Sequence, residues 1–177
     1  AENYKGEIKF CSVTGTGELV KGYGDNIGGI AGNNSMPDSK IKYSWVSGDY
    51  ISAHSDSTYF VDRIGGITGN NYGTIQECYT ELIQIDSDEY GVGGIAGANN
   101  GYILDSYSKS NIYGGDNQLA GIVGNNSGQI FRCYSAGPVH NANEDGGIAG
   151  RNSGTISDSV WDLSVTGKTR AAAGGTV

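Results

Sequence analysis

The sequence predicts an all-β protein, a parallel β-solenoid of five to six coils with 26–28 residues in each regular coil and right-handed connections. A Gly-Ile phrase, typified by Gly-Gly-Ile-Ala-Gly-Asn-Asn, recurs five times and starts at Gly28, Gly65, Gly93, Ala120 and Gly146. A second phrase, an Ile followed three residues later by Cys or Ser, follows every copy. Glycine makes up 31 of the 177 residues, well above its usual share of about 7%.

The spacing of the phrases identifies the repeating unit. Successive Gly-Ile phrases start 37, 28, 27 and 26 residues apart, and in the last four copies the second Ile follows the first by 8 residues. A fixed period of this size indicates stacked structural units. A β-sandwich of short strands, with turn signals about every 8–12 residues, is the alternative. It does not explain the constant 8-residue step.

Each coil contains two recognisable strands and a specified turn. The Gly-Ile phrase is too rich in glycine for a helix and predicts a strand with its Ile inward. An Asn-x-Gly turn leads to the second phrase, where Ile and Cys or Ser cannot both face inward on a flat strand, so a bend lies between them. Stacking then predicts an Ile ladder and an Asn ladder. Their members are Ile30, Ile67, Ile95, Ile122 and Ile148, and Asn34, Asn71, Asn99, Asn126 and Asn152. Trp45, Tyr79, Tyr107 and Tyr134 predict an aromatic ladder beside them.

The three cysteines occupy one repeat position. Cys11, Cys78 and Cys133 alternate there with serines. Two cysteines separated by a serine coil would lie about 9–10 Å apart, given a strand spacing of about 4.8 Å, and this exceeds the reach of a disulfide. We therefore expect three reduced thiols that face inward as small core residues.

The chain reads as one domain, residues 1–177. Residues 1–27 are expected to form an incomplete N-terminal coil, because Ile8–Cys11 is a copy of the second phrase without a Gly-Ile partner. Residues 159–177 depart from the repeat and are expected to close the stack. This departure fits the atypical terminal repeats of solenoids.

Charge and motif content exclude several functions. The net charge of −8 disfavours nucleic acid as a partner, and no apolar stretch is long enough to span a membrane. The metallopeptidase motif His-Glu-x-x-His is absent, and His54 and His140 are interpreted as exposed loop residues. No Gly-x-Ser-x-Gly elbow is present. We expect neither catalysis nor a cofactor.

Two sets of residues are candidates for binding. Asp86, Asp88 and Glu89 form the best candidate for a Ca²⁺ site, although acidic residues along a solenoid also serve as a solvated edge. Four tyrosines in turns or variable segments suit a face that binds carbohydrate or protein, although tyrosine in a β-rich protein needs no ligand. These tyrosines are Tyr72, Tyr90, Tyr102 and Tyr113.

The paired phrases, as in Gly-Gly-Ile-Ala-Gly-Asn-Asn and Ile-Phe-Arg-Cys-Tyr-Ser, resemble the GLUG repeat of large bacterial surface and secreted proteins, which also occurs in IgA-specific metalloendopeptidases. The segment Ser159-Val160-Trp161-Asp162 is similar to the sequence that often closes a GLUG array. The resemblance covers roughly residues 6–175. It implies an extracellular or cell-surface location, a multidomain parent protein and a module that is not catalytic.

These observations together predict a stalk, spacer or adhesive surface of a secreted or cell-surface bacterial protein. Its expected partners are other domains of a longer parent chain and a host glycan or protein. One alternative is an accessory domain that positions substrate for a secreted metallopeptidase. Another is a subunit that associates end to end, because a solenoid with uncovered ends presents open strand edges.

Overall fold

The fold is a stack of coils whose strands form parallel sheets. The computed structural model describes the chain except residues 24, 54–62, 89, 115–117, 141–142 and 175–177. Within the described residues, the strands form four sheets of seven, six, six and five strands, here called sheets A, B, C and D, and every pairing between them is parallel. The predicted parallel β-solenoid is confirmed.

Each sheet takes one strand from each successive coil. Sheet A contains β1 (Glu2–Asn3), β5 (Ala31–Asn34), β9 (Thr68–Asn71), β13 (Ala96–Asn99), β17 (Val123–Asn126), β21 (Ala149–Asn152) and β24 (Ala172–Gly174). Sheet B contains β2 (Glu7–Lys9), β6 (Lys40–Lys42), β10 (Thr74–Gln76), β14 (Tyr102–Leu104), β18 (Gln129–Phe131) and β22 (Thr155–Ser157). Sheet C contains β3 (Ser12–Gly22), β7 (Trp45–Ala53), β11 (Tyr79–Ser87), β15 (Tyr107–Ser108), β19 (Tyr134–Ser135) and β23 (Val160–Trp161). Sheet D contains β4 (Asn26–Gly28), β8 (Arg63–Gly65), β12 (Val92–Gly93), β16 (Leu119–Ala120) and β20 (Asp145–Gly146).

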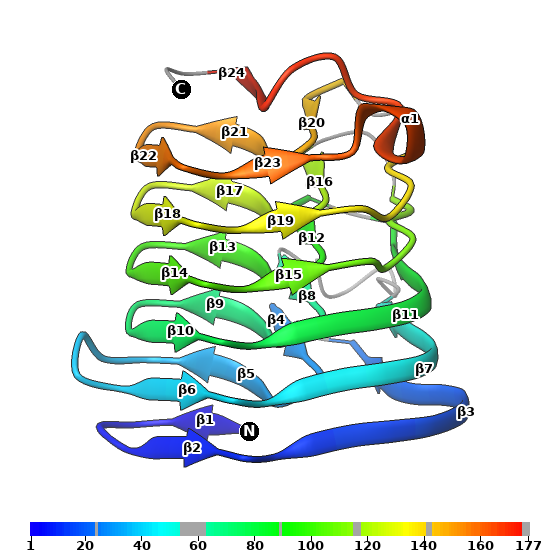
Figure 1. The fold of residues 1–177 in the computed structure, drawn as a ribbon. Coiled ribbons are helices and arrows are strands. Elements are labelled where there is room, and N and C mark those ends of the chain that lie inside the picture. Colours follow the sequence, from blue (N-terminus) through cyan, green and yellow to red (C-terminus); the bar gives the residue numbers. More distant parts are fainter. Residues whose placement is uncertain (24, 54–62, 89, 115–117, 141–142, 175–177) are drawn as a thin grey trace.

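The chain passes through the sheets in the order A, B, C and D in each of its first five coils. In Figure 1 the strands of sheets B and C run from left to right across the front, and those of sheet A return behind them as the chain rises, so the coil is right-handed. The N-terminal coil lacks the Gly-Ile phrase, yet it contributes β1, β2, β3 and β4 to all four sheets. In the sixth coil a four-residue helix, α1 (Leu163–Thr166), follows β23.

The core consists of isoleucine ladders, whose burial provides about 1.5–3 kcal/mol per side chain. In sheet B the register places the Ile of each second phrase directly on the next, and the central members Ile41, Ile75, Ile103 and Ile130 are fully buried. Four of the five Gly-Ile isoleucines, Ile67, Ile95, Ile122 and Ile148, are also fully buried. Ile30 is only partly buried, because it is the lowest member of its ladder.

The predicted asparagine ladder runs inside the corner between sheets A and B. Each side-chain amide donates to the amide oxygen of the Asn in the next coil at 2.7–2.8 Å, from Asn3 through Asn152. The members from Asn34 to Asn126 are fully buried. Most of these amides also donate to a carbonyl of the neighbouring turn, such as Asn71 to Gly73. The ladder therefore fixes the turn as well as the stacking.

The expected bend occurs between sheets B and C at one repeat position. In all six coils the residue before the Cys or Ser has a left-handed backbone, with φ between 47° and 55°. These residues are Phe10, Tyr43, Glu77, Asp105, Arg132 and Asp158. None is glycine, although this conformation is costly for other residues. The bend lets the Ile and the Cys or Ser of the second phrase face the same interior.

The second glycine of the Gly-Ile phrase is required because the interior is narrow. A Cβ on Gly94 would lie 2.1 Å from the Gly121 carbonyl oxygen and 2.1 Å from the Ser108 Oγ of sheet C. Backbone of the next coil and the inner side chain of sheet C therefore leave no room for a methyl group. The repeated glycine is a packing requirement of the coil.

The expectation of three inward thiols is wrong for one of them. All three cysteines are free, and Cys78 and Cys133 are buried, but Cys11 is exposed. Cys11 lies in the first coil, where no preceding coil covers the interior. A serine one coil above each cysteine accepts a hydrogen bond from the cysteine backbone N–H, as Ser106 does from Cys78 at 3.2 Å. The alternation of Cys and Ser therefore has a hydrogen-bonding role.

Candidate binding surfaces

The four candidate tyrosines do not form one face. Tyr72 and Tyr102 lie near the turns from sheet A to sheet B, and their side chains are 46% and 45% exposed. Tyr90 and Tyr113 lie between sheets C and D on a different side of each coil. The prediction that these tyrosines serve as ligand contacts remains open, but a single ligand face that includes all four is not present.

Tyr113 packs against a neighbouring histidine. The rings of Tyr113 and His140 stack with their centroids 3.7 Å apart, and His140 Nε2 lies 2.9 Å from Asn111 Oδ1. Burial, with a smaller contribution from Lys168, lowers the pKa of His140. His140 is thus half-buried and packed rather than an exposed loop residue. His54 lies outside the described residues.

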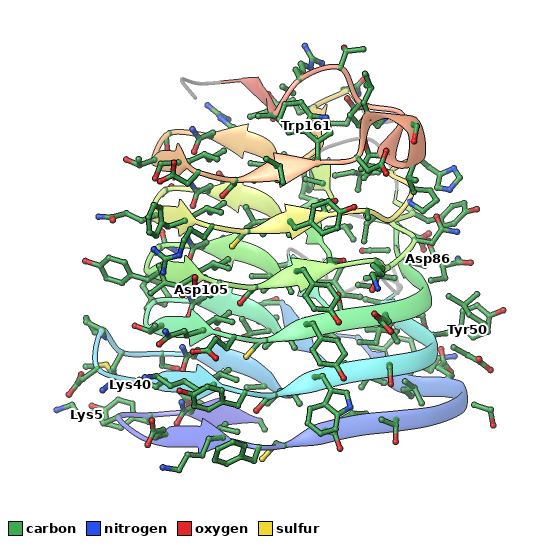
Figure 2. The ribbon with its side chains drawn as sticks, in the orientation of Figure 1. Lys5, Lys40, Tyr50, Asp86, Asp105 and Trp161 are labelled. Atoms are coloured by element: carbon green, nitrogen blue, oxygen red, sulfur yellow. The ribbon has the colours of Figure 1, made fainter. Side chains whose placement is uncertain are left out.

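The candidate calcium ligands are only partly described. Asp86 lies near the end of β11, on the right in Figure 2, and Asp88 follows that strand. Glu89 lies outside the described residues. Among those described, no three His, Cys, Asp or Glu residues are grouped so that they could hold a metal ion.

The predicted aromatic ladder occupies the outer face of sheet C. The ring centroids of Trp45 and Tyr79 are 5.8 Å apart and those of Tyr79 and Tyr107 are 5.0 Å apart, with interplanar angles of 4° and 3°. Tyr134 lies opposite Tyr107 in the strand register and so occupies the same position in the next coil. Because the ring faces lie on one another, the column presents ring edges to solvent. A sugar that stacks on an aromatic face would find the faces of the central rings already covered.

Charged side chains flank this column. Lys109 Nζ lies 2.9 Å from Glu81 Oε1 and 5.3 Å from the centre of the Tyr107 ring. Burial and the nearby Glu81 raise the pKa of Tyr107. At the corner beside it, Arg132 and Asp105 form a bidentate pair, and this hydrogen bonding lowers the pKa of Asp105. These exposed groups neutralise each other.

The buried thiols are unsuited to nucleophilic chemistry. Burial raises the pKa of Cys78 and of Cys133 to about 11, so both remain protonated at neutral pH. The serines between them are bound to backbone groups, as Ser106 is to the carbonyl of Leu104 at 2.7 Å. These side chains are structural.

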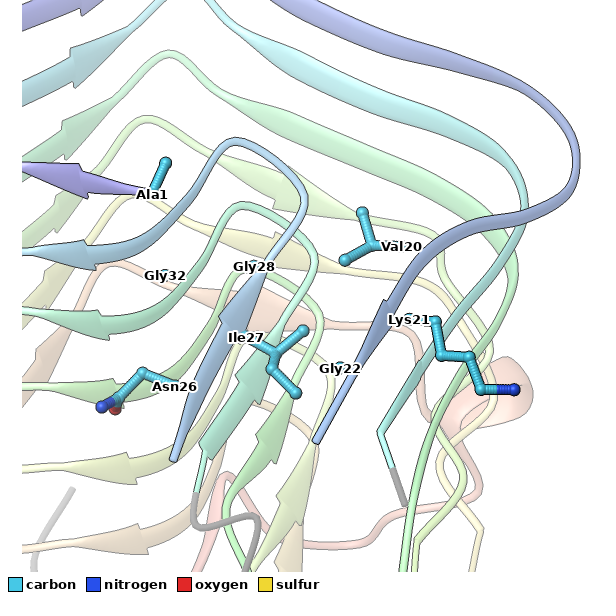
Figure 3. Close-up of a pocket in the computed structure, with 8 residues that line it drawn as sticks. All are labelled: Ala1, Val20, Lys21, Gly22, Asn26, Ile27, Gly28 and Gly32. Atoms are coloured by element: carbon cyan, nitrogen blue, oxygen red, sulfur yellow. The ribbon is translucent and has the colours of Figure 1, made fainter. Parts of the chain in front are cut away.

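A shallow pocket of about 150 Å³ lies at the N-terminal end, between the end of β3 and β4. Figure 3 shows Val20 and Ile27 at its centre, with Asn26 and Lys21 turned to opposite sides. In the part of the chain that the structure describes, the buried Oδ1 of Asn26 has no hydrogen-bond partner. Sites for small molecules combine an apolar lining with convergent polar groups, and this pocket lacks the convergence.

A different cluster was not singled out from the sequence. Four lysines and three aromatic residues gather on the first two coils, around the outer face of sheet B. Figure 2 shows Lys5 and Lys40 at this lower left corner. The members are Tyr4, Lys5, Lys9, Phe10, Lys40, Lys42 and Tyr43, here called the lysine–aromatic patch. The signal available in the sequence is a run of lysines at outward positions of two stacked strands.

Comparison with protein-family models, with curated proteins and with solved structures finds no match to this chain. Among the described residues, no helix is long and apolar enough to cross a membrane.

Proposed function

We propose that this chain is a non-catalytic repeat module of a secreted or cell-surface bacterial protein, which acts as a stalk or spacer and offers an outer surface for adhesion. The observation that supports this proposal is the continuity of the ladders. Hydrogen-bonded asparagines and buried isoleucines continue from coil to coil without interruption. The resemblance to the GLUG repeat supports the extracellular location.

A stack of this kind holds its two ends at a fixed separation. Each coil adds the strand spacing of about 4.8 Å, so six coils make a rod of roughly 25–30 Å. Each coil buries its apolar side chains against the neighbouring coils and is not stable alone. Bending the stack would open these contacts, so the stack is stiff. Length is therefore set by the number of coils.

Distance measurement between spin labels tests the spacer proposal. Ser12 and Val160 stand at the two ends of one outward column of sheet C, five register steps apart. We expect the variant Cys11→Ser, Ser12→Cys, Val160→Cys to give a narrow distribution, with label sites about 24 Å apart. Duplication of residues 93–119 should lengthen this distance by about 4.8 Å. A broad distribution, or no lengthening, would contradict the proposal.

The adhesive part of the proposal is tested separately. A glycan and protein array, probed with and without a calcium chelator, would identify a ligand and show whether Ca²⁺ takes part. A ligand that binds only without chelator would support a metal role for Asp86 and Asp88. No binding to any array would leave the chain as a spacer alone.

End-to-end association is a second candidate, and one observation favours it. Among the described residues, no strand pairs with the lower edges of β1 to β4, and Val13 and Val20 of β3 are only partly buried. Open edges are templates for pairing. Light scattering over a wide concentration range should then show growth in mass. A constant monomer mass would exclude it.

A further inference from the structure

The lysine–aromatic patch has a charge opposite to that of the whole chain. Four of the 11 basic residues, Lys5, Lys9, Lys40 and Lys42, lie in this patch, although the net charge of the chain is −8. The register of β2 with β6 places Glu7 beside Lys40 and Lys9 beside Lys42, all on the outer face of sheet B. Positive charge is thus concentrated on an otherwise acidic protein.

Few carboxylates neutralise this charge. Glu7 pairs with Lys9 at 3.2 Å, and this hydrogen bond, together with the charges of Lys42 and Lys40, lowers the pKa of Glu7. Among the described residues, no carboxylate lies within ion-pair distance of Lys5, Lys40 or Lys42. Other acidic residues near the patch are Glu2, whose carboxylate accepts a hydrogen bond from Ser35 Oγ at 2.6 Å, Asp38, on the turn before β6, and Glu77, one coil above Tyr43.

The aromatic residues of the patch differ from the column on sheet C. The ring centroids of Phe10 and Tyr43 are 5.1 Å apart with an interplanar angle of 11°, but Phe10 belongs to the first coil and is 70% exposed. One face of its ring is therefore open. Tyr4 is 63% exposed, and Lys5 Nζ lies 5.8 Å from its ring centre. The patch offers the open ring face that the central column lacks.

The backbone under the patch is well defined. Lys5, Phe10 and Tyr43 all have left-handed backbones at turns or bends. The N–H of Lys5 donates to Ser39 Oγ at 2.9 Å, and that of Phe10 donates to the carbonyl of Lys42 at 3.2 Å. A surface fixed in this way loses less conformational entropy when it binds a partner.

We propose that the lysine–aromatic patch binds an acidic polysaccharide, a chain of sugar rings that carry carboxylate or sulfate groups. The Cα atoms of Lys9 and Lys42, one coil apart, are separated by about 4.8 Å, and those of Lys40 and Lys42, two residues apart on β6, by about 6.6 Å. These three lysines therefore present spaced cations to a chain of spaced anions. The open face of Phe10 provides the flat apolar contact that a sugar ring takes. The inference rests on the adhesive part of the proposed function.

Other polyanions fit less well. Nucleic acid carries one charge per about 1.7 Å of duplex and requires a broad basic face, whereas the surrounding surface is acidic. Anionic lipids are concentrated in the cytoplasmic leaflet, which an extracellular module does not meet. Both remain as outcomes of the test.

The test compares two triple variants with equal change in charge. Lys9→Gln, Lys40→Gln and Lys42→Gln alter the patch, and Lys21→Gln, Lys109→Gln and Arg151→Gln alter exposed residues elsewhere. Binding of polygalacturonate, heparin and neutral dextran would be measured by calorimetry at two salt concentrations. We expect the patch variant to lose at least about tenfold in affinity for an acidic polymer, since each lysine contact releases counterions. The control should change less than twofold, and dextran should not bind.

Two further variants separate charge, ring contact and folding. Replacement of the same three lysines by arginine should restore binding, and Phe10→Ala should weaken binding to polygalacturonate several-fold while the melting temperature stays the same. Equal losses in the patch and control variants would overturn the proposal. So would tighter, lysine-dependent binding to oligothymidylate or to phosphatidylserine vesicles. If a glycan found on the array binds the triple lysine variant as tightly as the unchanged protein, the inference is overturned but the proposed adhesive function is not.

Discussion

The two ends of the stack carry the same repeat but differ in what covers the last coil. At the N-terminal end, Val13 and Val20 of β3 are partly buried, whereas Val46 and Ile51, directly above them in register, are fully buried. At the C-terminal end, the inner position of sheet C is filled by Trp161, labelled at the top of Figure 2. An inward-facing side chain is therefore fully buried only where a neighbouring coil or a cap covers it.

The C-terminal cap is built from residues outside the repeat. The indole N–H of Trp161 donates to the carbonyl of Lys168 at 2.7 Å, and the Lys168 ammonium lies 2.7 Å from Asp145 Oδ2. Asp162 is the N-cap of helix α1, and its carboxylate accepts hydrogen bonds from the backbone N–H groups of Ser164 and Val165. Strand β24 then covers β21 of sheet A. Terminal repeats of solenoids generally need such covers.

The largest expected effect is at the cap. Lys168→Met removes one partner of an ion pair whose side chains are only 8% and 15% exposed, and it takes away the shorter of the two ion pairs given for Asp145, at 2.7 Å against 3.9 Å for Arg170. Loss of one member of a buried pair costs about 3–5 kcal/mol. Chemical denaturation would measure this loss. The matched variant at the open end, Lys9→Met, breaks an exposed pair and should leave the melting temperature unchanged. A similar loss in both variants would contradict the difference between the ends.

The next largest loss of stability is expected in the middle of the asparagine ladder, and it is compared with the loss at the end of the ladder. Asn99→Ala leaves the Asn71 amide and the Asn126 oxygen without their ladder partners, which should cost about 2–4 kcal/mol. Asn3→Ala removes only the bond to Asn34 within the ladder and should cost clearly less. Urea unfolding of both variants gives the comparison. Equal losses would show that the ladder does not transmit stability along the axis.

A smaller effect distinguishes two serines on the inner face of sheet C. Ser108 Oγ accepts hydrogen bonds from Thr80 Oγ1 and from the backbone N–H of Ser110, whereas the buried Ser135 Oγ has no hydrogen-bond partner among the described residues. We expect Ser108→Ala to destabilise by about 1 kcal/mol and Ser135→Ala to be neutral or stabilising. Thermal unfolding of both variants would show a lower melting temperature for Ser108→Ala and an equal or higher one for Ser135→Ala. Destabilisation by Ser135→Ala as large as that by Ser108→Ala would contradict this expectation.

The smallest effect is a pH dependence near the cap. Burial lowers the pKa of His140, so the folded state favours the neutral imidazole. Its contribution to stability is therefore complete above the unfolded pKa of about 6.5 and is lost as the pH falls through the lower folded value. The melting temperature should fall over this range, and His140→Gln should make the fall shallower. An unchanged slope in this variant would assign the pH dependence to other groups.

The sequence was sufficient for the regular part of the fold. The 8-residue step and the Asn-x-Gly turns recur in the last four copies of the repeat, and the pairing of Ile with Cys or Ser recurs in all six. These recurrences predicted the coil, its ladders and the bend. The left-handed backbone at the bend could not be read from residue type, since Phe10, Glu77 and Arg132 share no preference for it.

The ends and the candidate sites were harder to predict. Cys11 occupies the same repeat position as Cys78 but is exposed, because it lies in the first coil. The repeat pattern alone does not indicate this difference in burial. Lys168 and Asp145 come from segments without a repeat, so nothing in the spacing indicated their contact. The four tyrosines share only their place in turns or variable segments, and these segments lie on different sides of the coil, since Tyr72 follows β9 and Tyr90 follows β11.

Native-state hydrogen exchange, followed peptide by peptide, tests the central claim most directly. The claim is that stacked coils form one cooperative rod with an open N-terminal end and a covered C-terminal end. We expect slow exchange in β9 to β18, similarly slow exchange in β21 to β23 beneath the cap, and markedly faster exchange in β1 to β3. Protection of β3 equal to that of β11, or exchange in β22 and β23 as fast as in β3, would contradict the account.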